Sequence, residues 1–272
     1  MIQDIAPSIF HNEYVVRKPS PDDYVFIFKN RQILVRDDGD SITCPKVSDI
    51  GNDKLQFLFT INNKYNYLYL GDEDISPEGF YYTDLKSLRR TDNKLLAFAG
   101  MTAYHLHTWY TNNRFCGRCG SKTIIYNKER ALKCPDCGNI IYPRISPAVI
   151  IAVTDGDKIV VTRYAGREYK GLALIAGFCE IGETAQETVA REVMEEVGLK
   201  VKNIRYYKSQ PWGFESDLLL GYYCQLDGDG TITMDASELK TAEWVHRDDL
   251  EEDNEHVSLT AEMMMAFKHK LF

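Results

Sequence analysis

The sequence lacks the features that would place the protein in or across a membrane. None of its apolar runs approaches the ~20 residues that a transmembrane helix needs. Its first residues, MIQDIAPSIFHNEY, lack the basic and apolar regions of a signal peptide, and the final KHKLF is no organelle address. Positive charge is also scarce, because 32 Lys and Arg face 40 Asp and Glu, for a net charge of −8. We therefore expect a cytoplasmic protein with no membrane partner and no broad attraction to nucleic acid.

The composition is that of an ordinary globular protein. The chain has 272 residues, of which 44% are hydrophobic and 26% charged. That length suits two domains and a small module, and it allows sizeable cores. Four of the seven cysteines stand in two CxxC pairs, which favours metal binding in a reducing compartment over disulfide formation.

The two CxxC pairs have the spacing of a metal site. The four candidate ligands are Cys116, Cys119, Cys134 and Cys137. The segment between the pairs predicts a hairpin, with an apolar run at 123–126 and a polar turn at 127–129. Four thiolates at this spacing favour a closed tetrahedral Zn²⁺ site, which has no open position and is therefore structural. A redox pair and an iron–sulfur cluster are the alternatives.

Residues 177–199, GFCEIGETAQETVAREVMEEVGL, predict a helix with defined ends. Thr184 and Glu187 have the spacing of a capping box, and Gly198 stands where a left-handed C-terminal residue is usual. The residues expected to face a core are Val189, Val193 and Val197, which recur every fourth position. A second face of the same helix carries charge.

Glu192, Glu195 and Glu196 fall together on that adjacent face. Carboxylates at this spacing repel one another, and a hard divalent cation such as Mg²⁺ or Mn²⁺ removes the repulsion. Such a cation also binds phosphate oxygens, which suits attack of water on phosphorus. The alternative is a solvated face of an amphipathic helix, but that interpretation leaves the fixed offsets of other residues unexplained.

The whole stretch reads G-x5-E-x7-R-E-V-x-E-E-x-G-L, and it resembles the signature of the Nudix hydrolases, which cleave nucleoside diphosphates linked to another moiety. A zinc ribbon directly before it and the sequence SQPW at 209–212 resemble the NADH pyrophosphatases within that superfamily. That family's motif is usually written SQPWPFPxS. Here Gly213 and Glu215 replace its later prolines, and Asp217 replaces its closing serine. We expect SQPW to form a loop, its continuation to be less rigid, and Glu215 to bring negative charge near the ligand.

The resemblance implies roles for particular residues. Catalytic metal would bind Glu192, Glu195, Glu196, Glu238 and the carbonyl of Ala176. The substrate pocket would include Tyr142, Phe178, Gln210, Trp212 and Glu238. Arg191 would orient box glutamates through a bidentate pair, and Glu183 would organise the loop. Either Glu195 or Glu196 would act as general base on a metal-bound water.

The expected fold is α/β in three parts: a strand-rich N-terminal domain at 1–110 that ends in a helix, a four-cysteine zinc ribbon at 111–143, and a C-terminal Nudix α/β/α sandwich at 144–272. In the first part, hairpins are predicted around the turns at 29–31 and 62–64, a helical turn at 84–89 and a helix at 92–110. In the last part, strands are predicted at 148–154, 158–162, 172–175, 204–208, 217–226 and 240–245, and a helix from about 258. Its methionine-rich stripe is expected in a core or a dimer contact.

The expected activity is hydrolysis of NADH or NAD⁺ to nicotinamide mononucleotide and AMP, with Mg²⁺ or Mn²⁺ in catalysis and a structural Zn²⁺. The family resemblance also implies a homodimer. Alternative substrates are ADP-ribose, a dinucleoside polyphosphate and NAD-capped RNA. An alternative of another class is a nucleotide-sensing regulator without hydrolysis, which the complete set of glutamates disfavours.

Overall fold

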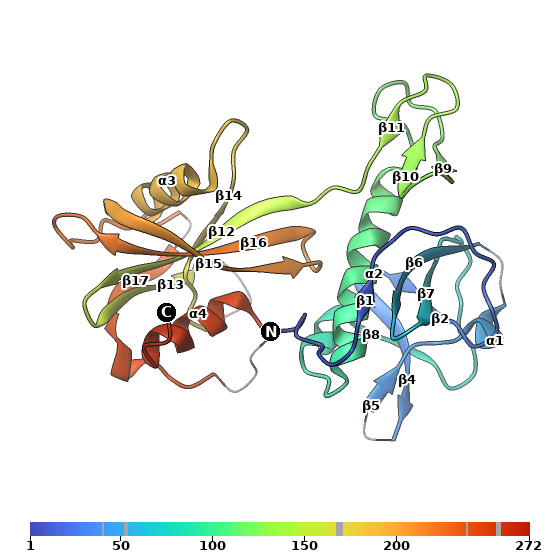
Figure 1. The fold of residues 1–272 in the computed structure, drawn as a ribbon, viewed down its shortest axis with the longest axis horizontal. Helices are drawn as coiled ribbons and strands as arrows, with labels where there is room; N and C mark the ends of the chain where they lie inside the picture. Colours follow the sequence, from blue (N-terminus) through green and yellow to red (C-terminus); the bar gives the residue numbers. More distant parts are fainter. Residues whose placement is uncertain (40, 52–53, 167–170, 238, 254–256) are drawn as a thin grey trace. The chain divides into compact units, whose positions relative to one another are not determined.

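The structure is a computed structural model that describes residues 1–39, 41–51, 54–166, 171–237, 239–253 and 257–272. The chain forms two compact units (Figure 1). One unit consists of Ile2–Arg144 together with the short segment Gly213–Ser216. The other consists of Met1, Ile145–Trp212 and Asp217–Phe272. We call them the N-terminal unit and the C-terminal unit.

Short strands dominate the first part of the N-terminal unit. The elements are β1 (Phe10–His11), β2 (Tyr24–Phe26), β3 (Phe28–Lys29), β4 (Gln32–Asp38), β5 (Ser41–Thr43), α1 (Val47–Ile50), β6 (Leu55–Ile61), β7 (Lys64–Tyr69), β8 (Tyr81–Asp84) and the 3₁₀ helix η1 (Leu85–Arg89). One sheet has the order β1-β6-β7-β2, and a second has the order β3-β4-β5 with β8 paired to β4. The predicted hairpins and the helical turn are therefore confirmed, although the run 24–28 is divided between the two sheets.

A long helix, α2 (Lys94–Asn112), follows these strands. It begins at Asn93, whose side chain accepts a hydrogen bond from the amide of Leu96 at 3.0 Å. Gly100 lies close to η1, since a Cβ at that position would lie 2.7 Å from a methyl carbon of Leu88. The predicted helix is confirmed, and its fully buried Met101 shows that it forms part of the core.

The zinc ribbon completes the N-terminal unit. It has three short antiparallel strands, β9 (Ile124–Tyr126), β10 (Ala131–Lys133) and β11 (Ile140–Ile141), in the order β11-β10-β9. Ala131 pairs with Tyr126 across the turn, so the predicted hairpin between the cysteine pairs is present.

The C-terminal unit is built on one mixed sheet. Its strands are β12 (Ser146–Asp155), β13 (Lys158–Tyr164), β14 (Ile175–Phe178), β15 (Val201–Trp212), β16 (Asp217–Leu226) and β17 (Leu239–His246). Its helices are α3 (Ala185–Val197), η2 (Arg247–Asp249) and α4 (Leu259–Lys268). The order is β15-β16-β12-β13-β17, and β14 pairs with β12. The long apolar strand β12 is therefore central, parallel to β16 and antiparallel to β14.

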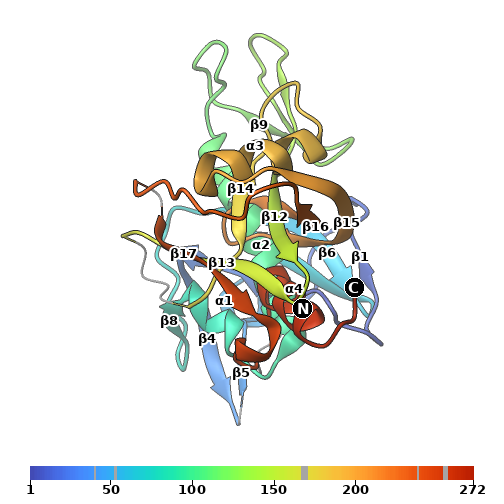
Figure 2. The same cartoon turned by 90° about the vertical axis from the view of Figure 1, so that its left-hand side faces the viewer.

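Alternate residues of β12 supply two separate cores. Val149, Ile151 and Val153 contact one cluster, which contains the valines of α3. Ile150 and Ala152 contact the other, which contains the methionines of α4. The two helices cover opposite faces of the sheet (Figures 1 and 2). The predicted α/β/α sandwich is confirmed, and the methionine-rich stripe belongs to its core.

Two sequence-based expectations for this unit are wrong in detail. The run 172–175 forms only an isolated bridge, between Ala173 and Thr162, and the strand proper begins at Ile175, where the chain reaches the edge of β12. The SQPW residues are not a loop, because all four belong to β15 and pair with β16. Pro211 is tolerated there because β15 is at the edge of the sheet.

Within the residues that the structure describes, no helix is both long enough and apolar enough to cross a membrane.

Candidate active site

Helix α3 begins and ends where its sequence predicts. Thr184 Oγ1 accepts a hydrogen bond from the amide of Glu187 at 3.2 Å, and the Glu187 carboxylate accepts one from the amide of Thr184 at 2.8 Å. At the other end Gly198 has a φ of +69°, and its amide donates to the carbonyl of Met194 at 3.1 Å. The predicted caps are confirmed, and they fix the rotation of the helix.

That rotation gives the helix two chemically different faces. Val189, Val193 and Val197 are fully buried against the sheet, as predicted. Of the three glutamates, Glu196 is 2% exposed, whereas the side chain of Glu195 is 60% exposed. The carboxylates thus lie at different depths, with one in the protein and one in solvent.

Arg191 lies at the centre of the charged face. Its Nη1 donates to Glu192 Oε1 at 2.7 Å and to Glu195 Oε2 at 2.9 Å. Its Nε and Nη2 bind the two oxygens of Glu183 at 2.7 and 2.9 Å, which is the predicted bidentate pair. Nη2 also donates to the carbonyl of Phe178 at 3.0 Å. One guanidinium therefore ties the helix, the preceding loop and strand β14 together.

Glu183 organises the loop before the helix. Its carboxylate accepts hydrogen bonds from the amide of Glu180 at 3.2 Å and from the hydroxyl of Thr188 at 3.0 Å. The hydrogen bond from Arg191 is the main reason that the pKa of Glu183 falls to about 2. The sequence did not point to Thr188, whose burial and hydrogen bond to Glu183 are visible only in the structure.

Gly177 has a packing role. A Cβ at this position would lie 1.9 Å from Cδ of Glu192 and 2.0 Å from its Oε1. The Glu192 carboxylate therefore lies directly against the backbone of β14, in space that any other residue would fill. Ala176, the predicted carbonyl ligand, is the preceding residue and pairs with Ile150 of β12.

This donor set fits a divalent metal ion. Oxygens of Glu192 and Glu195 converge on one cationic atom, Arg191 Nη1, and Glu192 lies beside the backbone of β14. Carboxylate and carbonyl oxygens are the ligands that Mg²⁺ and Mn²⁺ prefer. The three carboxylates of Glu183, Glu192 and Glu195 gather around one guanidinium, and a divalent ion would bind the oxygens of such a cluster.

The four cysteines of the ribbon form a second metal site. Their sulfurs all lie within 4.8 Å of one another, and among the described residues theirs is the only group of three or more metal-binding side chains gathered so closely. Cys116 and Cys137 sulfurs are 3.7 Å apart, and those of Cys119 and Cys134 are 3.4 Å apart. Tetrahedral ligation at about 2.3 Å requires sulfurs at close to this separation. The predicted zinc site is supported.

Each cysteine pair lies on its own backbone turn, and the two turns have the same hydrogen-bond pattern. The amide of Gly120 donates to the carbonyl of Cys116, and the amide of Gly138 donates in the same way to Cys134. Both glycines have positive φ, at +80° and +73°.

The residues predicted to bind substrate differ in how much of their surface is exposed. Phe178 is exposed and Trp212 is half-buried at the end of β15, opposite Asp217. Gln210 is fully buried, and its amide binds the carbonyl of Val257 at 2.9 Å and the amide of Leu259 at 2.7 Å. A side chain with no exposed surface does not fit the predicted substrate contact, and Gln210 instead holds the start of α4 on β15.

Two further predicted site residues are Tyr142 and Glu238. Tyr142 belongs to the N-terminal unit and is exposed, and its hydroxyl donates to Glu129 at 2.9 Å. Glu238 lies outside the described residues. Cys179 of the signature loop is half-buried and not part of the cysteine cluster.

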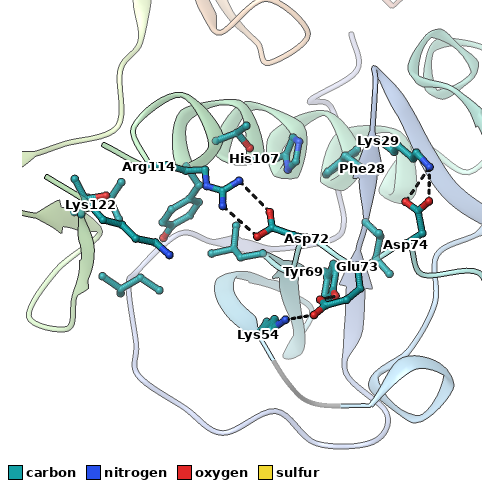
Figure 3. A pocket seen from close by; sticks show the side chains of 18 of the residues that line it. Phe28, Lys29, Lys54, Tyr69, Asp72, Glu73, Asp74, His107, Arg114 and Lys122 are labelled. Atoms are coloured by element: carbon teal, nitrogen blue, oxygen red, sulfur yellow. Dashed lines mark hydrogen bonds and ion pairs between the residues drawn. The ribbon is translucent and has the colours of Figure 1, made fainter. Parts of the chain in front are cut away.

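A separate cavity of about 500 Å³ lies in the N-terminal unit, between the strands, α2 and the ribbon (Figure 3). Three consecutive acids, Asp72, Glu73 and Asp74, line it, and we call them the acidic turn. The partners are Arg114 for Asp72 at 2.9 and 3.1 Å, Lys54 for Glu73, and Lys29 for Asp74 at 2.8 Å. Each carboxylate therefore has a cation of its own.

Two protein-family models match the chain. The NUDIX domain family matches residues 144–267, and the NADH pyrophosphatase zinc ribbon domain matches residues 111–142. Together the matches span more than half of the chain.

Curated relatives match more than half of the chain. A protein from Pseudomonas syringae pv. syringae named NAD-capped RNA hydrolase NudC is 38% identical over 186 residues, which is 68% of this chain and 66% of the relative. Its namesake from Klebsiella pneumoniae is 39% identical over 170 residues, 61% of this chain and 65% of the relative. The chain thus spans slightly less than two thirds of the length of these relatives. A solved NUDIX hydrolase from Nitrosomonas europaea aligns with 57% of this chain and 93% of its own, at 22% identity and a TM-score of 0.48.

Proposed function

The chain belongs to the family of Nudix hydrolases that carry an NADH pyrophosphatase zinc ribbon, and from this premise we propose that it hydrolyses the pyrophosphate bond of NADH or NAD⁺. Water attacks one phosphorus, the bridging P–O bond breaks, and the products are nicotinamide mononucleotide and AMP. The observation that carries the proposal is the array of Glu183, Glu192 and Glu195 around Arg191, beside the buried Glu196.

The same bond occurs at the 5′ end of an NAD-capped RNA, and the relatives' names make that the second candidate substrate. ADP-ribose and dinucleoside polyphosphates contain a related bond and remain alternative substrates. The ribbon's zinc serves structure, because four thiolates leave no open position. We also retain the expectation of a homodimer and of a cytoplasmic location, where thiols stay reduced.

The catalytic ion in this proposal is Mg²⁺ or Mn²⁺, and Glu192, Glu195, Glu196 and the carbonyl of Ala176 would hold it. Glu238 remains a further candidate ligand. A bound divalent ion lowers the pKa of a coordinated water and offsets the charge of the phosphate oxygens. Glu195 or Glu196 accepts the proton of the attacking water. Arg191 keeps Glu183 and the carbonyl of Phe178 in place, so that β14 and α3 present a fixed surface.

Binding of the substrate's planar groups falls to the aromatic residues. Trp212 and Phe178 both retain exposed surface, and an aromatic face stacks well on a nucleobase or a nicotinamide ring. Tyr142 is a third candidate for this contact. Gln210 is left out of the pocket because its amide is engaged in the core.

A hydrolysis panel tests the proposal. The intact protein, with its zinc, is given NADH, NAD⁺, ADP-ribose, a dinucleoside polyphosphate and an NAD-capped RNA, each with Mg²⁺ or Mn²⁺, and the products are separated by chromatography. We expect NADH or NAD⁺ to give nicotinamide mononucleotide and AMP at the highest kcat/KM. A clear preference for another substrate would replace the substrate assignment. No turnover on any of them by folded, zinc-loaded protein would favour the sensor instead.

A further inference from the structure

The turn between β15 and β16 belongs to the N-terminal unit, although both strands belong to the C-terminal unit. Gly213–Ser216 folds with Ile2–Arg144, whereas Trp212 and Asp217, the residues on either side, fold with the sheet. Trp212 and Asp217 are also paired across the turn. The turn therefore continues directly from β15, the strand that contains Trp212, but it folds with the N-terminal unit.

One side chain of the turn forms an ion pair within the N-terminal unit, and a second is buried. Glu215 accepts hydrogen bonds from Arg31 Nη2 at 2.8 Å and from Arg31 Nη1 at 3.5 Å. Arg31 stands at the tip of the β3–β4 hairpin, with its guanidinium 5.7 Å from the ring centre of Tyr104 of α2. Phe214 is only 6% exposed. The sequence predicted a negative charge near the ligand at Glu215, and in the structure this carboxylate forms an ion pair with Arg31.

Gly213 fits against α2 so closely that no side chain can replace its hydrogen. A Cβ there would lie 2.4 Å from the carbonyl oxygen of Met101 and 3.1 Å from the carbonyl carbon. These are backbone atoms of a buried helix, which cannot move aside cheaply. The backbone of Gly213 is not left-handed, so contact rather than conformation requires the glycine. The turn is therefore packed closely against α2 at Gly213.

We propose that the N-terminal unit sets the position of Trp212 through this turn, with Arg31, Glu215 and Gly213 as positioning residues for dinucleotide binding. The inference rests on the proposed function, in which Trp212 stacks on a planar group of the substrate. Trp212 is bonded directly to Gly213, so a shift of the turn on α2 displaces the indole. Stacking acts equally on bound substrate and transition state, and its loss raises KM while kcat stays nearly constant.

The test measures kcat and KM for NADH, and the Kd for NADH by calorimetry with Ca²⁺ as a non-catalytic ion. The variants are Arg31→Gln, Glu215→Gln, the double variant, the exchange Arg31→Glu with Glu215→Arg, and Gly213→Ala. The matched control is Asp74→Asn, which removes an exposed ion pair with Lys29, a residue of the same hairpin. Zinc content and melting temperature establish that every variant is folded.

We expect Arg31→Gln and Glu215→Gln each to raise KM and Kd about twofold to fivefold, the range that an exposed ion pair can supply. The double variant should be no worse than either single change, and the exchange should restore wild-type values. Gly213→Ala should have the larger effect, roughly tenfold, because a backbone contact must move. In a Trp212→Ala background none of these changes should matter, since they act through that residue.

Unchanged KM and Kd in Glu215→Gln and Gly213→Ala, an exchange that restores nothing, or an equal effect of Asp74→Asn would overturn the inference. The failure of the proposed function looks different. In that case the wild-type protein itself has no turnover on the panel, and the calorimetric Kd of the variants still decides whether the turn positions the binding residue.

Discussion

The chain has two acidic clusters, and their carboxylates are paired with cations in different ways. On α3 and its preceding loop, Glu183, Glu192 and Glu195 all bind the single cation Arg191. In the acidic turn of the N-terminal unit, three consecutive carboxylates bind three separate cations (Figure 3). The carboxylates of one cluster converge on one cation, and those of the other are spread over three.

This difference explains why a run of acids is by itself a poor sign of a metal site. Carboxylates gather for a divalent ion only where their charge is left uncompensated and their oxygens are directed at one place. Oxygens of Glu192 and Glu195 meet at one atom of Arg191, whereas the carboxylates of the acidic turn are divided among Arg114, Lys54 and Lys29. The proposed catalytic ion therefore fits the cluster on α3 better than the acidic turn.

The largest effect should follow from Glu196→Gln. This change alters the buried carboxylate of the proposed metal site. Asp72 lies in the acidic turn, so Asp72→Asn leaves that site unchanged. We expect kcat/KM to fall roughly a thousandfold or more, since metal-assisted stabilisation of the transition state is worth several kcal/mol. The measurement is NADH hydrolysis under saturating Mg²⁺ or Mn²⁺. A variant that kept its turnover, with a normal melting curve, would remove Glu196 from the mechanism.

The next effect concerns the four cysteines, where one cation is again shared by several anions. Cys134→Ser should abolish stoichiometric zinc binding and unfold the ribbon, because zinc binding supplies about 10–16 kcal/mol in small sites of this kind. Metal analysis and limited proteolysis near the ribbon measure the loss. The control is Cys179→Ser, which leaves the four-sulfur cluster intact. Equal zinc content in both variants would contradict the assignment.

Local features of the sequence predicted the fold class, the caps of α3 and the cysteine cluster. The caps at Thr184 and Gly198, the valine spacing and the CxxC pairs depend on residues only a few positions apart, and short-range geometry determines them. The resemblance to a known signature then directed attention to Glu192 and its neighbours.

Contacts between distant residues could not be predicted in this way. Arg31 and Glu215 are 184 positions apart, and nothing in either local sequence indicates the other. Gln210 stands in a recognisable motif, yet its amide holds the start of α4, 49 residues away. The strand character of SQPW depends on its pairing with β16, which compensates for the poor strand propensity of Pro211.

A smaller effect is expected from Arg191→Gln, which removes the shared cation. Arg191 holds the pKa of Glu183 at about 2, against an ordinary 4.5. A lowered pKa stabilises the fold above pH 4.5, and this contribution disappears as the pH falls towards 2. The wild-type protein should therefore be more stable than the variant at pH 7, and the difference should shrink between pH 4.5 and 2. Denaturant unfolding without added divalent ion measures it, and a constant difference across that range would refute the coupling.

Activity of the same variant separates orientation from direct catalysis. Loss of an orienting partner typically lowers activity or metal affinity about 10- to 100-fold. We expect kcat/KM of Arg191→Gln to fall by that amount and to recover in part at higher Mn²⁺, because the glutamates remain. Arg191→Lys should rescue little, since an ammonium cannot make the bidentate pair with Glu183. Full rescue by lysine would mean that only the charge of Arg191 matters.

The smallest effect should come from the acidic turn. Asp72→Asn breaks an ion pair whose side chains are 75% and 50% exposed, and such pairs contribute little because water screens them. The melting temperature should change by no more than about 4 °C, with kcat and KM for NADH unchanged. If this variant instead lost turnover as Glu196→Gln does, the contrast between shared and separate cations would not distinguish a catalytic cluster from a structural one. The pairing of each carboxylate with its own base makes the small effect the physical expectation.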